Sequence, residues 1–352
     1  MDITKVAVKN NQGGRGCLVI NYPRLGDAIM SYSAIRSLSL DSQFAGLIVA
    51  YPATPVSKSS YFIHHFPFPQ QYKEFDPNWY AFSEENWGKI TDFMRMERIM
   101  TVVNLQNEGP LYDKDYYRFK EVYAGQFNFW ELDSYQIYHG ARKIHLLEST
   151  KKMFEVRNVQ WWYPPRRTFQ EMRRGNVIFF VGSNEANKRW GVKQWIRVIR
   201  QLSSKYRNEK FLVLSGVSRQ EREEINHIHD GIANLPNVSV VGPETLDESF
   251  ERIGKSKFVI SHDTYPIHLA SLLSIPVLGI YFSTDPVIWG SYLNEYKYIS
   301  SPLACFGRKQ GTGNCSHFHT TCPNIDEIKK SITVEQVVFE GVRMIEKITQ
   351  KS

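Results

Sequence analysis

The stretch from Val259 to Gly290 limits the fold more than any other part of the chain. It contains an apolar segment, a polar turn that begins at His262, a helical run and a second apolar segment. A second polar turn, which begins at Ser283, follows. This order predicts a βαβ unit with polar residues after both strands. Open α/β sheets bind their ligands at that edge.

The first of these turns is suited to an anionic group. The backbone N–H groups of residues 263–267 would point outward at the start of the predicted helix, where the helix dipole attracts a phosphate. Asp263, Thr264 and His268 are therefore candidate binding residues.

Two other segments repeat the strand, turn and helix order. Residues 17–20 lead through a Gly-containing turn into a helix at 28–38, and residues 176–181 lead through the turn 182–190 into a helix at 192–206. A Pro- and Arg-rich linker lies between the two halves. We therefore predict two Rossmann-like α/β domains, at residues 1–165 and 175–333. No GxGxxG is present, so the dinucleotide fingerprint is absent.

The turn at 182–190 reads GSNEANKRW. Small residues, free N–H groups and hydroxyls, with a lysine that reaches back over them, form a constellation that binds a pyrophosphate. Ser183, Asn184 and Lys188 are the candidates, and the alternative is a solvated Lys-Arg pair on a loop. A carboxylate after the next strand, Glu221 or Glu223, could bind ribose hydroxyls. Acidic residues that favour a first helical turn are the equal alternative.

The formal net charge of +7 indicates an anionic partner, although mere solubility explains it equally well. The basic residues are scattered, which argues against nucleic acid. No apolar run approaches the roughly 20 residues that span a bilayer. The first residues contain no apolar signal core, so we expect a cytoplasmic protein with at most peripheral membrane contact. The aromatic and basic region at 112–138 suits either sugar stacking or a packed helical layer.

Three segments together resemble glycosyltransferase family 9, the ADP-heptose:lipopolysaccharide heptosyltransferases. Arg24-Leu25-Gly26-Asp27 is similar to the family's RxGD turn, and residues 182–190 are similar to its G-x-S-x-x-x-K-x-W turn. The run from Asp263 to Ala270, with Thr284-Asp285-Pro286-x-x-Trp289-Gly290, is similar to its donor-binding segment. The chain has Tyr265 where the family usually has Gly, which implies a differently shaped helix start.

The resemblance implies the GT-B architecture, with two Rossmann-like domains that face each other across a cleft. The acceptor would bind to residues 1–165 and the donor to 175–333, and a last helix at 334–352 would pack back on the first domain. It implies an inverting transfer of heptose from ADP-heptose to a hydroxyl of a lipopolysaccharide core or related glycan. The chain would bind no nucleic acid and need no cofactor.

The resemblance also assigns roles to single residues. Asp27 would be the general base, Arg24 would contact the acceptor, and Lys188 would neutralise the leaving group. Thr245 belongs to a segment that lies beside the adenine in the family. Without the resemblance, Asp27 is explained as a helix N-cap.

Three cysteines and two histidines gather near the end of the chain: Cys305, Cys315, Cys322, His317 and His319. These residue types could bind structural Zn or Fe. The spacing fits no standard zinc module, and a loop of reduced thiols is the alternative. Two other functions stay open. One is a transferase of the same fold with another nucleotide sugar or a protein acceptor, and the other is a catalytically degenerate member that binds a glycan.

Overall fold

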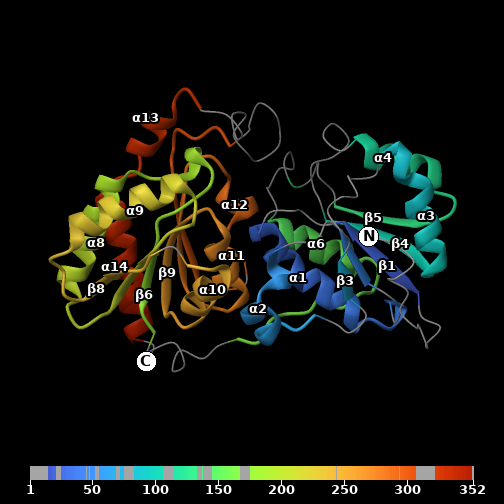
Figure 1. The fold of residues 1–352 in the computed structure, drawn as a ribbon, viewed down its shortest axis with the longest axis horizontal. Coiled ribbons are helices and arrows are strands. Elements are labelled where there is room, and N and C mark those ends of the chain that lie inside the picture. The colour runs from blue at the N-terminus through green and yellow to red at the C-terminus, as the bar shows by residue number, and fades with distance from the viewer. Residues whose placement is uncertain are drawn as a thin grey trace. The chain divides into compact units, whose positions relative to one another are not determined.

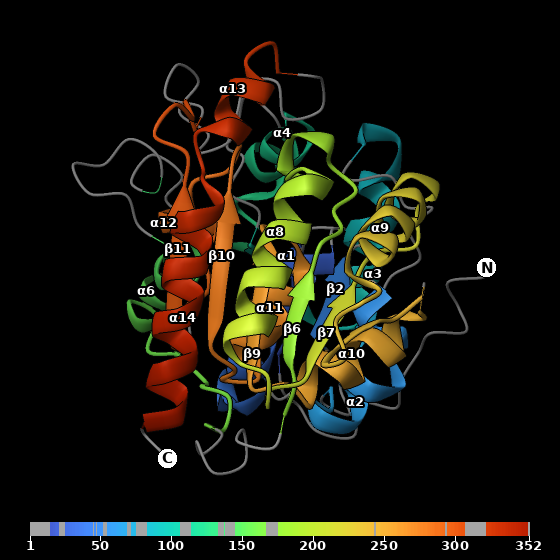
Figure 2. The same ribbon diagram turned by 90° about the vertical axis from the view of Figure 1, so that its left-hand side faces the viewer.

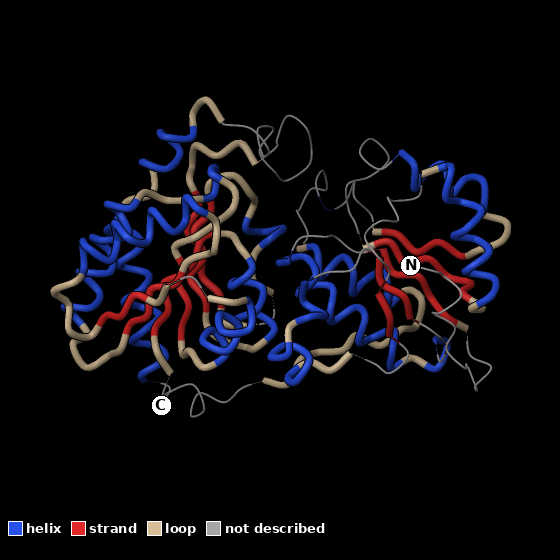
Figure 3. Tube along the Cα trace, viewed as in Figure 1, coloured by secondary structure: helices blue, strands red, loops and turns tan. Residues whose placement is uncertain are grey.

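The computed structural model divides the chain into two compact units, one of residues 1–140 and 146–163 and one of residues 141–145 and 164–352. It describes residues 15–20, 25–44, 46, 48–51, 55–68, 72–74, 83–105, 114–132, 137, 145–166, 175–242, 244–292, 294–306 and 322–350. Each unit contains a sheet with helices on both of its faces (Figure 1; Figure 3). The predicted α/β class is confirmed.

In the first unit, the described strands form a parallel sheet in the order β3-β2-β1-β4-β5. The strands are β1 (Gly16–Ile20), β2 (Ile48–Tyr51), β3 (Tyr72–Glu74), β4 (Ile99–Asn104) and β5 (Asn128–Glu131). The helices are α1 (Leu25–Leu40), α2 (Ser60–His65), α3 (Trp87–Met96), α4 (Lys114–Tyr123) and α6 (Leu146–Glu155).

Helix α1 is buried along most of its length, with apolar residues and small serines on its covered sides. Ten of its 16 residues are buried. Tyr32, at its centre, has edge-to-face contacts with four rings, those of Phe62, Phe66, Phe68 and Trp162. In α4, Tyr116 and Phe119 are buried in the core with Trp87. For these two aromatics, the packed helical layer is the correct alternative.

In the second unit, the described strands form a parallel sheet in the order β11-β10-β9-β6-β7-β8. The strands are β6 (Val177–Phe180), β7 (Phe211–Leu214), β8 (Val238–Val240), β9 (Phe258–His262), β10 (Val277–Tyr281) and β11 (Tyr296–Ser300). Every residue of β6, β9 and β10 is buried. Central strands of parallel sheets are covered on both faces, which explains their nearly continuous apolar sequences.

The helices of the second unit are α8 (Val192–Lys205), α9 (Arg219–Ile232), α10 (Leu246–Gly254), α11 (Tyr265–Leu272), α12 (Pro286–Trp289), α13 (Ile325–Lys330) and α14 (Val334–Gln350). Helices α8 and α14 pack against each other on one face of the sheet, while α11 packs on β9 and β10 beside α10 (Figure 2). No helix within the described ranges is long and apolar enough to cross a membrane.

The last helix uses its apolar side within the second unit. Val337, Met344 and Ile345 of α14 belong to the same core cluster as Leu202 of α8 and Ile260 of β9. The helix is amphipathic, and these contacts cover its apolar stripe within the second unit. That the helix also packs back on the first domain stays a prediction.

Candidate functional site

The polar turns of the second unit meet at the carboxyl edge of its sheet. β6 lies between β7 and β9, and the chain passes from β6 to β7 on one side before it returns to β9 on the other. The carboxyl ends of β6 and β9 therefore form a topological switch point, the place where open α/β sheets bind ligands. The turns that follow these two strands contain Lys188 and Asp263.

Lys188 and Asp263 form a buried ion pair at this point. The Nζ atom of Lys188 lies 2.7 Å from Oδ2 of Asp263, and the two side chains are 14% and 5% exposed. The hydroxyl of Thr284, which follows β10, also donates to Oδ2. Burial alone would raise the pKa of Asp263, but the ammonium group of Lys188 and the smaller effects of His268 and Thr284 lower it overall. The site thus contains a lysine ammonium group that a carboxylate orients.

His268 lies one turn into α11, close to this pair. It is 6% exposed, and burial lowers the pKa of its imidazole to about 4, with the Asp263 charge opposing the shift. The ring is therefore neutral at neutral pH. Within the described part of the chain, its Nδ1 atom has no hydrogen-bond partner. A buried polar atom without a partner is uncommon and is often satisfied by a ligand.

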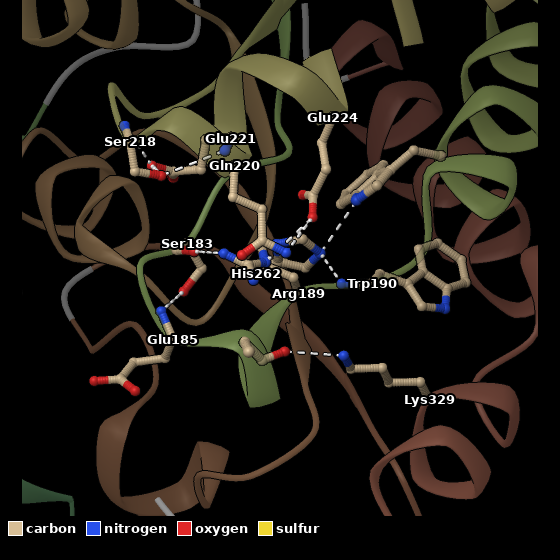
Figure 4. Close-up of polar contacts among 12 residues, drawn as sticks. Ser183, Glu185, Arg189, Trp190, Ser218, Gln220, Glu221, Glu224, His262 and Lys329 are labelled. Atoms are coloured by element: carbon tan, nitrogen blue, oxygen red, sulfur yellow. Dashed lines mark hydrogen bonds and ion pairs between the residues drawn. The ribbon is translucent and has the colours of Figure 1, made fainter. Parts of the chain in front are cut away.

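The turn that carries Lys188 is fixed by polar contacts on several sides (Figure 4). The Oγ atom of Ser183 accepts from the backbone N–H of Glu185 at 3.3 Å, and the Ser183 carbonyl accepts from Arg189 Nη1 at 3.0 Å. Lys329 Nζ donates to the Ala186 carbonyl at 2.9 Å. Ser183 is buried, whereas the predicted candidate Asn184 is exposed at the tip of the turn.

Glu221 lies under the ends of β6 and β7. It is 2% exposed, and its Oε2 atom accepts from the backbone N–H and the hydroxyl of Ser218 in a capping box at the start of α9. A Cβ atom at Gly182 would lie 2.4 Å from Glu221 Oε1, and one at Gly216 would lie 2.3 Å from it. Both glycines therefore make room for this carboxylate at the ligand-binding edge. Both interpretations of Glu221 are compatible with this geometry.

Glu223 lies apart from the edge. It forms an ion pair with Arg219 on α9, with side chains that are 60% and 94% exposed. The structure does not bring it together with Glu221, because these two helical positions point to different sides.

The candidates on α10 and α11 occupy helix starts. Thr245 is the N-cap of α10 and forms a capping box with Glu248. Thr264 is the N-cap residue of α11, with extended backbone at φ −153° and ψ 175°. Tyr265 turns its ring into the packing between Phe180 and Phe250, and its hydroxyl lies 2.6 Å from Ser249 Oγ. The ring of this unusual residue is thus anchored to α10.

Asp27 lies in the first unit, inside the first turn of α1. Because the helix begins at Leu25, Asp27 is not its N-cap, which corrects that interpretation. It is half-buried, and an acidic residue in a first turn is favoured by the helix dipole. Arg24 lies outside the described residues.

The predicted metal ligands fall largely outside the described part of the chain. Cys315, His317 and His319 belong to the residues that are not described. Cys305 is exposed and Cys322 is buried in the core of the second unit. Among the described residues, no group of three or more His, Cys, Asp or Glu side chains could bind a metal ion.

Two residues that sequence reasoning missed help to build the site. Arg189 is 6% exposed, and its Nε atom lies 3.4 Å from Oε1 of Glu224 on α9. His262 is fully buried at the end of β9. Their sequence signal was weak but present. A histidine that ends an apolar strand must bury its ring nitrogens, and buried polar atoms need partners.

Comparison with known proteins shows similarity over part of the chain. The family model of glycosyltransferase family 9 (heptosyltransferase) matches residues 147–315. The lipopolysaccharide heptosyltransferase 3 of Escherichia coli is 24% identical over 149 residues, which cover 40% of this chain and 43% of that protein. The chain thus spans less than half the length of this curated relative.

Solved structures share the whole fold. The ADP-heptose lipopolysaccharide heptosyltransferase II of E. coli has a TM-score of 0.59 and 16% identity, covering 94% of this chain and 99% of that one. A heptosyltransferase of E. coli solved with ADP has a TM-score of 0.54 and 14% identity, with the same coverage. The predicted GT-B fold is confirmed. The motifs at residues 182–190 and 263–290 lie within the matched residues, so the chain is similar to glycosyltransferase family 9 over 147–315, a little under half of its length.

Proposed function

We propose that the chain is an inverting glycosyltransferase that moves a heptose from an ADP-heptose to a hydroxyl of a lipopolysaccharide core or related glycan. The observation that carries the proposal is the buried Lys188–Asp263 ion pair at the switch point of the second sheet. The donor and acceptor classes are supported by the names of similar proteins, which are lipopolysaccharide heptosyltransferases.

The diphosphate of the donor would bind at this edge. Lys188 would donate to a phosphate oxygen and neutralise charge as ADP leaves. Asp263 already orients the ammonium group, so little reorganisation is needed when the ligand arrives. Ser183, Asn184 and Thr264 would supply hydrogen bonds, and the start of α11 would add its dipole. His268, neutral and buried, would donate to or accept from the sugar or phosphate through a ring nitrogen.

The nucleoside would lie toward β7 and α10. Glu221 Oε1 would accept from a ribose hydroxyl between the two glycines that leave room for it. Thr245 would contact the base. Glu223 is not included in this proposal because it pairs with Arg219 on the exposed side of α9.

Asp27 would act as the general base, and Arg24 would contact the acceptor. The carboxylate would take the proton of the acceptor hydroxyl while that oxygen attacks the anomeric carbon. The bond from this carbon to the diphosphate breaks, and its electron pair leaves with ADP. Attack from the face opposite the leaving group inverts the anomeric centre. None of these steps needs a metal.

The proposed acceptor also implies a location for the protein. A glycan built on a lipid would be met in the cytoplasm at a membrane surface, and the net charge of +7 would favour peripheral contact with anionic lipid. Flotation with anionic vesicles, compared with neutral vesicles, tests this part separately.

The test of the donor site is calorimetry with ADP, UDP and GDP. We expect ADP to bind, and Lys188→Met to weaken it about 10- to 100-fold, the cost of one charge-assisted hydrogen bond. The matched control is Lys193→Met, which removes the same charge from an exposed position on α8. Equal affinity in wild type and Lys188→Met would reject the assigned role of Lys188.

A different nucleotide preference would favour the alternative, a transferase with another nucleotide sugar. The Tyr265 side chain motivates this alternative because its hydroxyl is bonded to Ser249 of α10, near the proposed nucleoside position. Binding of no nucleotide would instead favour a degenerate member that binds a glycan.

A further inference from the structure

His262 joins the two halves of the proposed donor site. It is the last residue of β9, and its side chain is completely buried. Its Nε2 atom accepts two hydrogen bonds, one from the backbone N–H of Trp190 at 2.9 Å and one from the indole N–H of Trp195 at 3.1 Å (Figure 4). Neither donor can act as an acceptor, so Nε2 must present its lone pair. The ring is therefore the neutral tautomer with its proton on Nδ1.

Burial keeps the ring in this form. It lowers the pKa of His262 to about 3, while the nearby backbone of Gly182 opposes the shift. A second proton would have to go onto Nε2, where two N–H groups already point. The two hydrogen bonds that Nε2 of His262 accepts from Trp190 and Trp195, together called the bridge, therefore stay intact across the physiological pH range.

The two residues that the bridge connects, Trp190 and His262, are close in sequence to Lys188 and Asp263. Trp190 is two residues after Lys188, and Asp263 is the residue after His262. The bond from Trp190 to His262 therefore spans the same two chain segments as the ion pair from Lys188 to Asp263. Trp195, on the first turns of α8, attaches the following helix to the same ring nitrogen.

The other anchors of the turn lead elsewhere. Arg189 connects it to Glu224 of α9, Lys329 of α13 binds the Ala186 carbonyl, and the N–H of Cys322 donates to Asn187 Oδ1 at 3.4 Å. These contacts place the turn relative to the helices on one side of the sheet. His262 places it relative to the strand that carries Asp263.

We propose that His262 is a positioning residue of the donor site, which acts through Trp190 to keep Lys188 opposite Asp263. The inference rests on the proposed function for the role of Lys188 in diphosphate binding. In this proposal, His262 acts only through Trp190, and Lys188 and Asp27 remain the residues that contact the reacting atoms.

Two amide variants separate position from polarity. In His262→Gln, the side-chain carbonyl oxygen reaches about as far as Nε2 and can accept both N–H groups. In His262→Asn, the amide ends one bond earlier, near the place of Nδ1, and leaves both buried donors without an acceptor. Val259→Ala, a buried change at the other end of β9, is the control for loss of stability alone.

The first readout needs no ligand. The carboxyl pKa of Asp263, followed by NMR with ¹³C-labelled aspartate, reports how closely Lys188 approaches it. We expect His262→Gln and Val259→Ala to keep the low wild-type value, and His262→Asn to raise it. The same low value in a folded His262→Asn variant would overturn the proposal, whatever the protein binds.

The second readout is ADP affinity by calorimetry. We expect His262→Asn to weaken binding about tenfold and His262→Gln to stay within about threefold of wild type, since the lost alignment affects one charge-assisted bond. If wild type binds no nucleotide, the proposed function fails while the Asp263 measurement still decides the role of His262. If His262→Asn is unfolded, His262→Gln decides alone. An Asp263 pKa raised above the wild-type value in folded His262→Gln would contradict the proposal, because the glutamine oxygen should accept both N–H groups in place of Nε2.

Discussion

The two units begin with the same topology, but different kinds of interaction hold their candidate residues in place. β1 lies between β2 and β4, as β6 lies between β7 and β9, so Asp27 and Lys188 follow equivalent strands. α1, which carries Asp27, is buried on most sides, with ten of its 16 residues covered. α8, which follows Lys188, buries five of 14 residues along one stripe.

The difference shows two ways to hold a side chain in place. In the first unit, burial of α1 and the aromatic rings around Tyr32 hold the helix that carries Asp27. In the second, the turn before α8 has few apolar residues, and ion pairs and hydrogen bonds to Arg189, Lys329 and His262 fix it. The first unit should therefore respond most to changes in volume, and the second to changes in hydrogen bonding and charge.

The largest expected effect is that of Asp27→Asn on transfer. If Asp27 is the general base, the Asp27→Asn variant should transfer about 10²- to 10⁴-fold more slowly than wild type. Its ADP affinity should be unchanged, because the nucleotide is proposed to bind to the second unit. Rates with ADP-heptose and a core acceptor, together with calorimetry, check this. Asp92→Asn, at a 72% exposed position of α3, is the control. Full turnover in Asp27→Asn would remove the residue from the mechanism.

A volume change in the first unit comes next. Tyr32→Ala removes a fully buried ring that contacts four aromatic neighbours. We expect a loss of about 3–5 kcal/mol in the free energy of unfolding, as for other aromatic truncations in cores. Urea denaturation measures it, with Tyr163→Ala at a 53% exposed position as the control. ADP affinity below the denaturation range should not change, and a parallel loss would show that the units are not independent.

The smallest effect per pH unit is the pH dependence of stability, which belongs to the second unit. His262 and His268 have folded pKa values of about 3 and about 4, below the ordinary 6.5. The unfolded chain therefore binds protons between about pH 4 and 6.5 that the folded unit does not. Stability should fall with decreasing pH in this window by about 1.4 kcal/mol per pH unit for each histidine.

Urea denaturation at pH 7, 6 and 5 tests this prediction. His262→Gln and His268→Gln should each reduce the pH dependence by the contribution of one proton. An unchanged slope in both variants would show that these rings are not buried in the neutral form. Variants of His227 and His229, which are exposed on α9, serve as controls for the loss of a histidine at the surface.

Much of the fold could be predicted from the sequence because its central strands are apolar. The predicted strands at residues 17–20 and 176–181 correspond to β1 and β6 within a residue at each end, and the apolar segment before the first polar turn corresponds to β9. The strands that escaped prediction, β3, β5 and β11, have sequences such as YKE and NFWE and lie at or next to sheet edges. An edge strand is partly exposed, so its sequence lacks the continuous apolar run from which a buried strand is predicted.

By itself, the sequence determined the two α/β units, the polar turns at their strand ends and the family motifs that name Asp27, Lys188 and Asp263. Propensity and apolar patterning act over a few residues, so a single chain displays them directly. Only the tertiary structure decided which polar residues meet. It paired Lys188 with Asp263, separated Glu223 from Glu221, turned the Tyr265 ring toward α10 and placed two N–H groups on His262. The contacts of Lys188 with Asp263 and of Trp190 with His262 arise because β6 lies beside β9, a strand that is not its neighbour in the sequence.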